Sequence, residues 1–254
     1  MNAHRELAPG VPEDYYRRIF DAERRHFWYR GMWVNAAALL RERMHAGGRL
    51  LDAGCGTGGF LRFALEEGAF DHVAGTDIAG AAIELARERV PEAELHVVPL
   101  RELPFSGASF ELVVSNDVLQ HVPELEVGES LRELRRVLVT GGALLLRTNG
   151  SRRLRRERDD WRAYDANTLR DRLVESGFQV ERVTHANLIL SLLAAMRGRV
   201  PHAPSEERHG IPMKPPGKLV SAVGGIALAG EARWLRRGRS LPYGHTLFAL
   251  AVRV

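Results

Sequence analysis

Residues 50–60 combine a carboxylate with a run of glycines, and their types imply chemistry more clearly than those of any other stretch. Asp52 closes an apolar run that predicts a buried parallel strand. The glycines that follow suit a tight strand-to-helix turn with positive φ, and they let a ligand approach bare backbone. Their spacing, Gly54-x-Gly56-x-x-Gly59, also matches a dinucleotide fingerprint, but a carboxylate here would repel a diphosphate. Asp52 therefore favours a ligand with a cationic amine.

A second carboxylate, Asp77, follows Asp52 by 25 residues and ends the predicted strand His72 to Asp77. An acidic side chain at the end of a second parallel strand can accept hydrogen bonds from both hydroxyls of a ribose. Asp77 is also placed to cap the next helix, and the two roles are compatible. A nucleoside that carries an amino acid group would satisfy both carboxylates. The pair therefore points to S-adenosylmethionine (SAM) as cofactor rather than to a nicotinamide dinucleotide, which stays open as an alternative.

The stretch Leu50 to Phe60 resembles motif I of the class I SAM-dependent methyltransferases, in the small-molecule subgroup called type 11. The resemblance extends over about residues 26–185 and includes Gly141-Gly142 before a predicted strand. It implies an α/β, Rossmann-like fold with a seven-stranded sheet in the order 3-2-1-4-5-7-6 and helices on both faces. Four parts are predicted. They are a helical cap (residues 1–45), a SAM-binding core (46–185), a helical insertion or lid between strands 6 and 7 (186–242), and the last strand of the core (243–254).

Periodicity and turn residues place the individual elements along this frame. Strands are predicted over residues 49–52, 72–77, 95–98, 110–115, 143–147, 178–184 and 245–253. Helices are predicted over residues 13–44, 60–67, 78–90, 129–138, 167–175, 186–196 and 219–237, the last interrupted at Gly224-Gly225.

The resemblance also implies which residues contact the cofactor. The backbone of Gly54, Cys55 and Gly56 would face it, Ile78 would pack on the adenine, and the Leu100 backbone would bond the adenine ring. Pro99 stands where the family usually has an adenine-binding Asp, so that contact is missing or supplied otherwise. Further cofactor contacts are expected after strand 4 and in the cap, from Asn116, Asp117, Tyr29 and Arg30.

An aromatic patch in the first predicted helix includes Trp28 and Tyr29, directly before Arg30. These rings either pack the helix on the sheet or cover the cofactor, where an aromatic face favours a sulfonium cation. In the resembling family, Arg at this place lies beside the methionine end of SAM. Arg30 is therefore predicted to pair with the methionine carboxylate as a bidentate contact.

His121 is the leading candidate for a catalytic base, because it follows strand 4 and an ordinary imidazole pKa near 6.5 suits proton removal. Packing over the cofactor is the alternative role for this ring. Tyr164 is a weaker catalytic candidate. The acceptor pocket is predicted, also weakly, to be lined by Trp28, Gln120, Trp161 and Tyr164.

The overall composition limits which kinds of partner and cellular compartment fit the chain. The pI is about 9.6, but only two of the 36 basic residues are lysines and the net charge is +4, which does not favour nucleic acid. Cys55 is the single cysteine, so no intrachain disulfide can form and a reducing cytoplasm fits. No signal peptide or stable membrane insertion is expected from the sequence. His202 and His209 lack partners at ligand spacing, so no metal site is predicted, and a homodimer stays open.

The resulting prediction is an enzyme that transfers methyl from SAM to a small-molecule substrate, with O-methylation in natural-product biosynthesis as the leading interpretation. A SAM-binding protein without methyl transfer, such as a cyclase or partner subunit, is one alternative. Another is a methyltransferase of a lipid, a quinone or a cell-envelope sugar. The acceptor atom is not encoded in motif I, because in-line methyl transfer requires positioning more than covalent participation by the protein.

Overall fold

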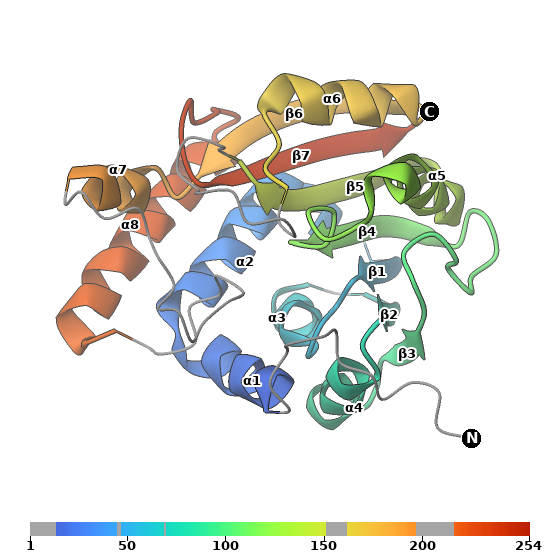
Figure 1. Ribbon diagram of the computed structural model, residues 1–254, viewed down its shortest axis with the longest axis horizontal. Helices are drawn as coiled ribbons and strands as arrows, with labels where there is room; N and C mark the ends of the chain where they lie inside the picture. Colours follow the sequence, from blue (N-terminus) through green and yellow to red (C-terminus); the bar gives the residue numbers. More distant parts are fainter. Residues whose placement is uncertain (1–13, 45–46, 69, 151–161, 197–215) are drawn as a thin grey trace.

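A seven-stranded sheet in the order β3-β2-β1-β4-β5-β7-β6 forms the centre of the molecule (Figure 1). The computed structural model describes residues 14–44, 47–68, 70–150, 162–196 and 216–254. Strands β1 to β5 pair in parallel, and β7 runs antiparallel between β5 and β6. The predicted fold and strand order are therefore confirmed.

The strands are β1 Arg49–Ala53, β2 His72–Asp77, β3 Glu94–Val97, β4 Phe110–Asn116, β5 Leu138–Asn149, β6 Phe178–Ala186 and β7 Thr246–Arg253. The helices are α1 Tyr15–Arg25, α2 Phe27–Leu40, α3 Gly59–Glu67, α4 Gly80–Arg89, α5 Val127–Val137, α6 Ala166–Glu175, α7 Leu188–Met196 and α8 Lys218–Arg236, with short 3-10 turns η1 Arg41–Met44 and η2 Glu124–Glu126.

Alternation along the strands divides the core into two layers, one on each face of the sheet. On one face Leu50, Leu112 and Leu145 pack with side chains from α2, α3, α4 and α8. On the other face Leu51 and Val113 pack with α5 and α6. Figure 1 shows this division, with α2, α3 and α4 toward the lower left of the strands and α5 and α6 toward the upper right. Asp52 follows the even-numbered pattern of β1, so its side chain lies on the face that α2 covers.

The single helix predicted over residues 13–44 is wrong, because the chain breaks at His26. His26 has extended backbone angles, and its Nδ1 accepts a hydrogen bond from the Trp28 backbone N–H at 3.1 Å. It therefore caps the N-terminus of α2, which leaves α1 free to take another direction.

Two further boundaries differ from the sequence prediction for local reasons. Helix α4 begins at Gly80 rather than at Ile78, because Ala79 is extended and its N–H bonds to Asp77. Strand β5 begins at Leu138, which pairs with Phe110, so the predicted turn at 140–142 is instead a bulge within the strand. Gly141 adopts φ +80° there, a value that favours glycine.

Helix α8 continues through Gly224 and Gly225, so the predicted interruption is wrong. Two positions in the contact between α2 and α8 carry glycine and leave no room for a Cβ. A Cβ added at Gly224 would lie 2.3 Å from the Phe27 ring, and one at Gly31 would lie 2.3 Å from Leu228 Cδ1. These glycines let the helices of the predicted cap and insertion pack against each other (Figure 1).

Candidate functional site

The glycine loop between β1 and α3 is held against the end of β2. The backbone N–H groups of Gly54 and Cys55 both donate to the Thr76 carbonyl, at 2.7 and 2.8 Å. Gly54 adopts φ +86°, and an added Cβ would lie only 2.1 Å from Val118 Cγ2. Gly56 also has positive φ, but a Cβ there would meet nothing within 4 Å among the described residues. The loop is thus tightly fitted beneath Gly54 and open at Gly56.

Asp77 fastens this loop to the end of β2. Its Oδ2 accepts from the Gly56 N–H and its Oδ1 from the Ala79 N–H, both at 2.9 Å. Burial raises the pKa of Asp77, and the two backbone hydrogen bonds oppose that shift. Each carboxylate oxygen keeps a further lone pair, so Asp77 can still accept hydrogen bonds from a ligand.

Asp52 is a buried carboxyl group with a different environment. It is 1% exposed, and its Oδ1 has no hydrogen-bond partner among the described residues. Burial raises the pKa of Asp52 to about 8; the charge of Glu23 raises it further, and the charge of Arg147 opposes the rise. A cationic group beside Asp52 would reverse this shift by favouring the ionised form. The site therefore has an unmet requirement for a donor, and a cation would meet it best.

A small cavity of about 140 Å³ lies where β2 and β3 end, beside the connection from β4 to α5. Its lining includes Gly54, Asp77, Ile78, Pro99, Leu100 and His121. Ile78 is 75% exposed, unusual for an isoleucine and suited to a residue that a planar ligand would cover. The structure thus brings together the residues predicted to hold the adenosine part of the cofactor.

Cys55 lies in the same loop with its thiol buried. Burial holds the pKa of that thiol well above its usual value, which disfavours the reactive thiolate. Its contribution to a site is therefore limited to backbone and packing.

The carboxyl ends of β4 and β5 carry a polar cluster that the sequence analysis identified only in part. Asp117 was predicted to contact the cofactor, but its Oδ2 pairs with Arg147 Nη2 at 2.7 Å. The Arg147 guanidinium also lies 5.4 Å from the centre of a Trp28 ring. Asn116, in register with Arg147, has an amide with no side-chain partner among the described residues. Tyr29 lies close by, buried, and its hydroxyl likewise has no partner in that part of the chain.

His121 and Gln120 follow β4 but take different positions. His121 is exposed and lines the small cavity. Gln120 is buried, and its Oε1 accepts from Thr148 Oγ1 at 3.2 Å and from the Asn149 N–H at 3.0 Å. The Gln120 side chain therefore holds the end of β5, which limits it as an acceptor contact.

Tyr164 does not reach the cavity. It is buried in the core beneath α5 and α6, and its hydroxyl lies 3.4 Å from the Leu119 carbonyl oxygen. This placement gives Tyr164 a packing role rather than the catalytic or lining role that the sequence predicted. Trp161 lies outside the described residues, as do the arginine-rich segment 151–158 and both His202 and His209.

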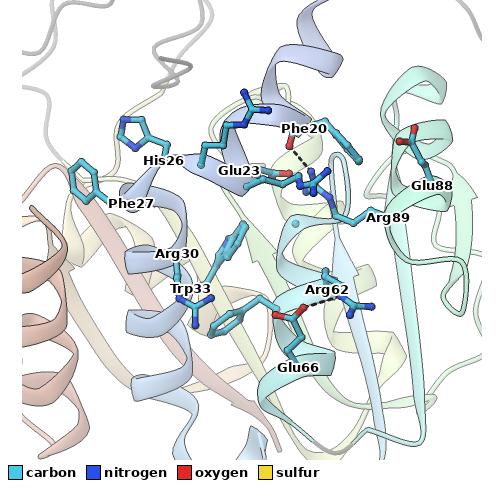
Figure 2. A pocket seen from close by; sticks show the side chains of 14 residues that line it. Phe20, Glu23, His26, Phe27, Arg30, Trp33, Arg62, Glu66, Glu88 and Arg89 are labelled. Atoms are coloured by element: carbon cyan, nitrogen blue, oxygen red, sulfur yellow. Dashed lines mark hydrogen bonds and ion pairs between the residues drawn. The ribbon is translucent and has the colours of Figure 1, made fainter. Parts of the chain in front are cut away.

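A larger cavity of about 560 Å³ lies between α1, α2 and α3 (Figure 2). Arg30 lines this cavity and not the one beside Gly54 and Asp77. Its side chain is 67% exposed and lies 3.8 Å from a Glu67 oxygen. Arg30 therefore faces the larger cavity, and its contact with the methionine carboxylate stays a prediction.

A buried ion pair, which the sequence analysis missed, forms the inner wall of the larger cavity. Figure 2 shows Glu23 of α1 and Arg89 of α4 pointing toward each other. Glu23 also accepts from Thr57 Oγ1 at 2.5 Å, so α1 is linked directly to the glycine loop. Burial raises the pKa of Glu23, while the Arg89 charge lowers it. No spacing in the sequence distinguishes Glu23 from the other charged residues of α1.

Within the described residues, no three His, Cys, Asp or Glu side chains gather as ligands for a metal ion. In the same part of the chain, no helix combines the length and apolar character needed to cross a membrane.

Comparison with known proteins finds a family match over the centre of the chain. Residues 51–146 match the family described as "Methyltransferase domain". A malonyl-[acyl-carrier protein] O-methyltransferase of Halorhodospira halophila is 34% identical over 143 residues, which are 51% of this chain and 48% of that protein. A demethylmenaquinone methyltransferase of Listeria welshimeri is 39% identical over 108 residues, 40% of this chain and 45% of that protein. The matches thus span about half the length of these curated relatives.

Solved structures share the fold over a longer part of the chain. A geranyl diphosphate methyltransferase in complex with SAM superposes with a TM-score of 0.61, at 15% sequence identity, over 97% of this chain and 93% of the other. At that identity the likeness shows the fold alone.

Proposed function

Because this chain belongs to the class I SAM-dependent methyltransferases, we propose that it transfers a methyl group to an oxygen atom of a small-molecule acceptor. Its cofactor is SAM, the methyl donor of the family. The observation that carries the proposal is the presence of two carboxyl groups beside one glycine loop, a half-buried one at the end of β2 and a buried one near the end of β1. One of them, Asp77, is held by backbone N–H groups, and the other, Asp52, has an oxygen without a partner among the described residues.

The residues present fit this cofactor. Asp52 offers a buried oxygen to the cationic amine, and Gly56 leaves space beside the loop that a side chain would fill. Asp77 keeps lone pairs for the ribose hydroxyls. Ile78 and the backbone of Leu100 line the cavity where an adenine would lie.

SAM supplies a methyl group bonded to a sulfonium sulfur, and the protein's part is to hold an acceptor in line with it. Asn116 and Tyr29 lie at the ends of β4 and α2, where the methionine part would extend from the nucleoside. His121 stands at the cavity wall as the candidate base for a hydroxyl acceptor. Asp117 acts on the site through Arg147. The described helices of the cap and of the insertion, α2 and α8, would cover the acceptor from the side of the sheet on which they pack.

The natural-product assignment is a finer part of the proposal. It is supported by the small-molecule subgroup that motif I resembles and by an Arg-biased composition. Oxygen as the acceptor atom is supported by the name of one relative, an O-methyltransferase.

Titration calorimetry with SAM, S-adenosylhomocysteine (SAH) and NADH tests the cofactor assignment. We expect SAM and SAH to bind and NADH not to bind. The Asp77→Ala variant should weaken SAH binding by about 1.5–3 kcal/mol, the range for a lost hydrogen bond to a charged group. Binding of NADH alone would overturn the assignment.

Methyl transfer itself is tested by incubating the protein with methyl-labelled SAM and a panel of hydroxylated and carboxylated small molecules. We expect acceptor-dependent formation of SAH together with label in the acceptor. Tight SAH binding with no labelled product from any acceptor would favour a SAM-binding protein without methyl transfer.

A further inference from the structure

Arg147 is a buried cation whose hydrogen-bonding capacity the protein uses only in part. The residue is 4% exposed, and Nη2 donates to Asp117 Oδ2 at 2.7 Å. Nε and Nη1 carry three of the five guanidinium N–H groups. Both atoms are buried and have no hydrogen-bond partner among the described residues. Buried donors of a charged group are costly to leave unpaired, so their presence here requires a function.

The neighbours of Arg147 favour a planar anion as its partner. Asn149 lies two residues further along β5, so it projects from the same face, and its amide nitrogen is another buried donor without a partner in the described residues. The Trp28 ring covers the guanidinium at 5.4 Å. Donors under an aromatic cover suit a carboxylate, which a guanidinium can bind through two parallel hydrogen bonds.

The position of Arg147 in the sheet indicates which molecule brings that carboxylate. Neighbouring strands lie about 4.8 Å apart, so β5 is roughly 10 Å from β1 and about 14 Å from β2 across the sheet. In the proposed function, Asp77 on β2 contacts the nucleoside and Asp52 on β1 contacts the amine of the cofactor. Arg147 lies beyond β4, on the side of Asp52 away from the nucleoside. Because the nucleoside would occupy the other side, an acceptor would have to reach the methyl group from this one.

Resting on the methyl-transfer function argued above, we propose that Arg147 binds a carboxylate of the acceptor, so that the substrates of this enzyme are small carboxylic acids. Asp117 positions the guanidinium by its ion pair, and Trp28 excludes water from the contact. The cofactor also has a carboxylate, on its methionine part. The test must therefore distinguish binding of the acceptor carboxylate from binding of the cofactor carboxylate.

The test compares carboxylic acids with amides of the same shape, bound to the SAH-saturated protein and measured by calorimetry. Benzoate against benzamide and hexanoate against hexanamide serve as probes. We expect the wild type to bind at least one acid about tenfold or more tighter than its amide, the effect of a charged hydrogen bond. Arg147→Gln should abolish that preference. Arg147→Lys should keep part of it, because lysine has the charge without the planar pair of donors.

Arg170→Gln is the matched control, because Arg170 is exposed on α6, and it should leave the preference unchanged. Thermal unfolding of each variant shows whether the fold is retained, and Arg147→Lys provides the comparison if Arg147→Gln fails to fold.

Binding of SAH and of 5′-methylthioadenosine, which lacks the amino acid group, separates the two carboxylates. We expect Arg147→Gln to leave both affinities within about twofold. A tenfold loss for SAH with no loss for 5′-methylthioadenosine would assign Arg147 to the cofactor and overturn the proposal. Equal binding of acids and amides by the wild type would also overturn it. Failure of the wild type to bind SAH would contradict the methyl-transfer function instead, and the acid–amide comparison without SAH would then test Arg147 by itself.

Discussion

Three charged residues lie at or near the carboxyl ends of β2, β1 and β5, and their different environments indicate different roles. Asp77 is bonded to two backbone N–H groups, Asp52 has a free buried oxygen within the described residues, and Arg147 is paired on one nitrogen only. A group whose hydrogen bonds are already made stabilises the fold, whereas one left partly unpaired in a buried place is suited to a ligand.

The raised pKa of Asp52 predicts a pH dependence of cofactor binding. The group is ionised only as the pH approaches about 8, and its contact with a cationic amine requires the ionised form. Binding therefore releases a proton at lower pH, and SAH affinity should fall by up to about tenfold per pH unit on that side. Above pH 8 the amine itself, with an ordinary α-amino pKa of about 8, loses its charge, so affinity should fall again.

Calorimetric titration of SAH from about pH 5.5 to 9 measures this profile. Asp52→Asn cannot ionise, so it should bind more weakly and lose the acidic limb. For 5′-methylthioadenosine, which lacks the α-amino group, we expect no pH dependence from Asp52. A flat SAH profile in the wild type would contradict the amine contact.

His121→Ala tests the proposed base. Its exposed position at the cavity wall predicts that turnover falls by about 10²–10⁴-fold while SAH affinity is retained, because a base acts on the acceptor and not on the cofactor. The wild-type rate should depend on an imidazole ionisation that the variant lacks. His96→Ala on β3, where His96 pairs with Glu94, is the control and should keep full turnover. Unchanged turnover in His121→Ala would leave the ring with a packing role.

At the scale of elements, a buried ion pair fixes the cap to the glycine loop. The side chains of Arg89 and Glu23 are 7% and 12% exposed, and Glu23 reaches Thr57 in the loop. Glu23→Ala removes the negative partner of the buried Arg89 guanidinium, which keeps its hydrogen bond to the Phe20 carbonyl; breaking a buried ion pair in this way typically costs about 3–5 kcal/mol of stability. We expect this variant to unfold at lower urea concentration and to bind SAH more weakly, because the loop loses a contact.

The pair Arg17–Glu88 supplies a matched control, because it joins the same two helices at the surface. Its atoms lie 3.1 Å apart, with side chains 53% and 55% exposed. Glu88→Ala should change stability by no more than about 1 kcal/mol. Equal effects of Glu23→Ala and Glu88→Ala would show that the buried pair does not hold the cap.

How much the sequence could predict follows from how local each signal is. The strands and the glycine loop were predictable because an apolar run closed by Asp52 and followed by glycines depends on neighbouring residues only. The same signal, a charge that closes an apolar run, also marks Arg147 at residues 143–147, and it would have identified this residue as a site candidate. Glu23 could not be found this way, because its burial depends on α4 packing over α1. The place of Arg30 at the larger cavity was not predictable either, because it depends on how α1, α2 and α3 pack around that cavity.

At the scale of the whole molecule, contact between α2 and α8 joins the predicted cap to the predicted insertion, although they are separated by the entire core in sequence. We expect the two parts to form one unit over the acceptor side of the sheet. Hydrogen exchange can test this expectation: amides of α2 and of α8 should gain protection together when SAH binds. Protection confined to α2 would show that the insertion is independent of the cofactor site.

Two adjacent glycines in α8 allow the contact between α2 and α8 to be tested, because alanine at either position adds the same single Cβ atom at a different place. Alanine is favoured over glycine inside a helix by about 1 kcal/mol, so Gly225→Ala, whose Cβ would meet nothing within 4 Å among the described residues, should stabilise the protein. Gly224→Ala makes the same chemical change, but its Cβ would lie 2.3 Å from the Phe27 ring, and relieving that overlap should cost about 1–3 kcal/mol. Urea unfolding of the two variants should therefore shift in opposite directions.

The same two variants should also differ in ligand preference. Because Phe27 begins α2, displacement of its ring should disturb Trp28 above Arg147. Gly224→Ala should therefore reduce the acid–amide preference, while Gly225→Ala preserves it. Stabilisation by both substitutions would mean that α2 and α8 are not packed as closely as the structure has them.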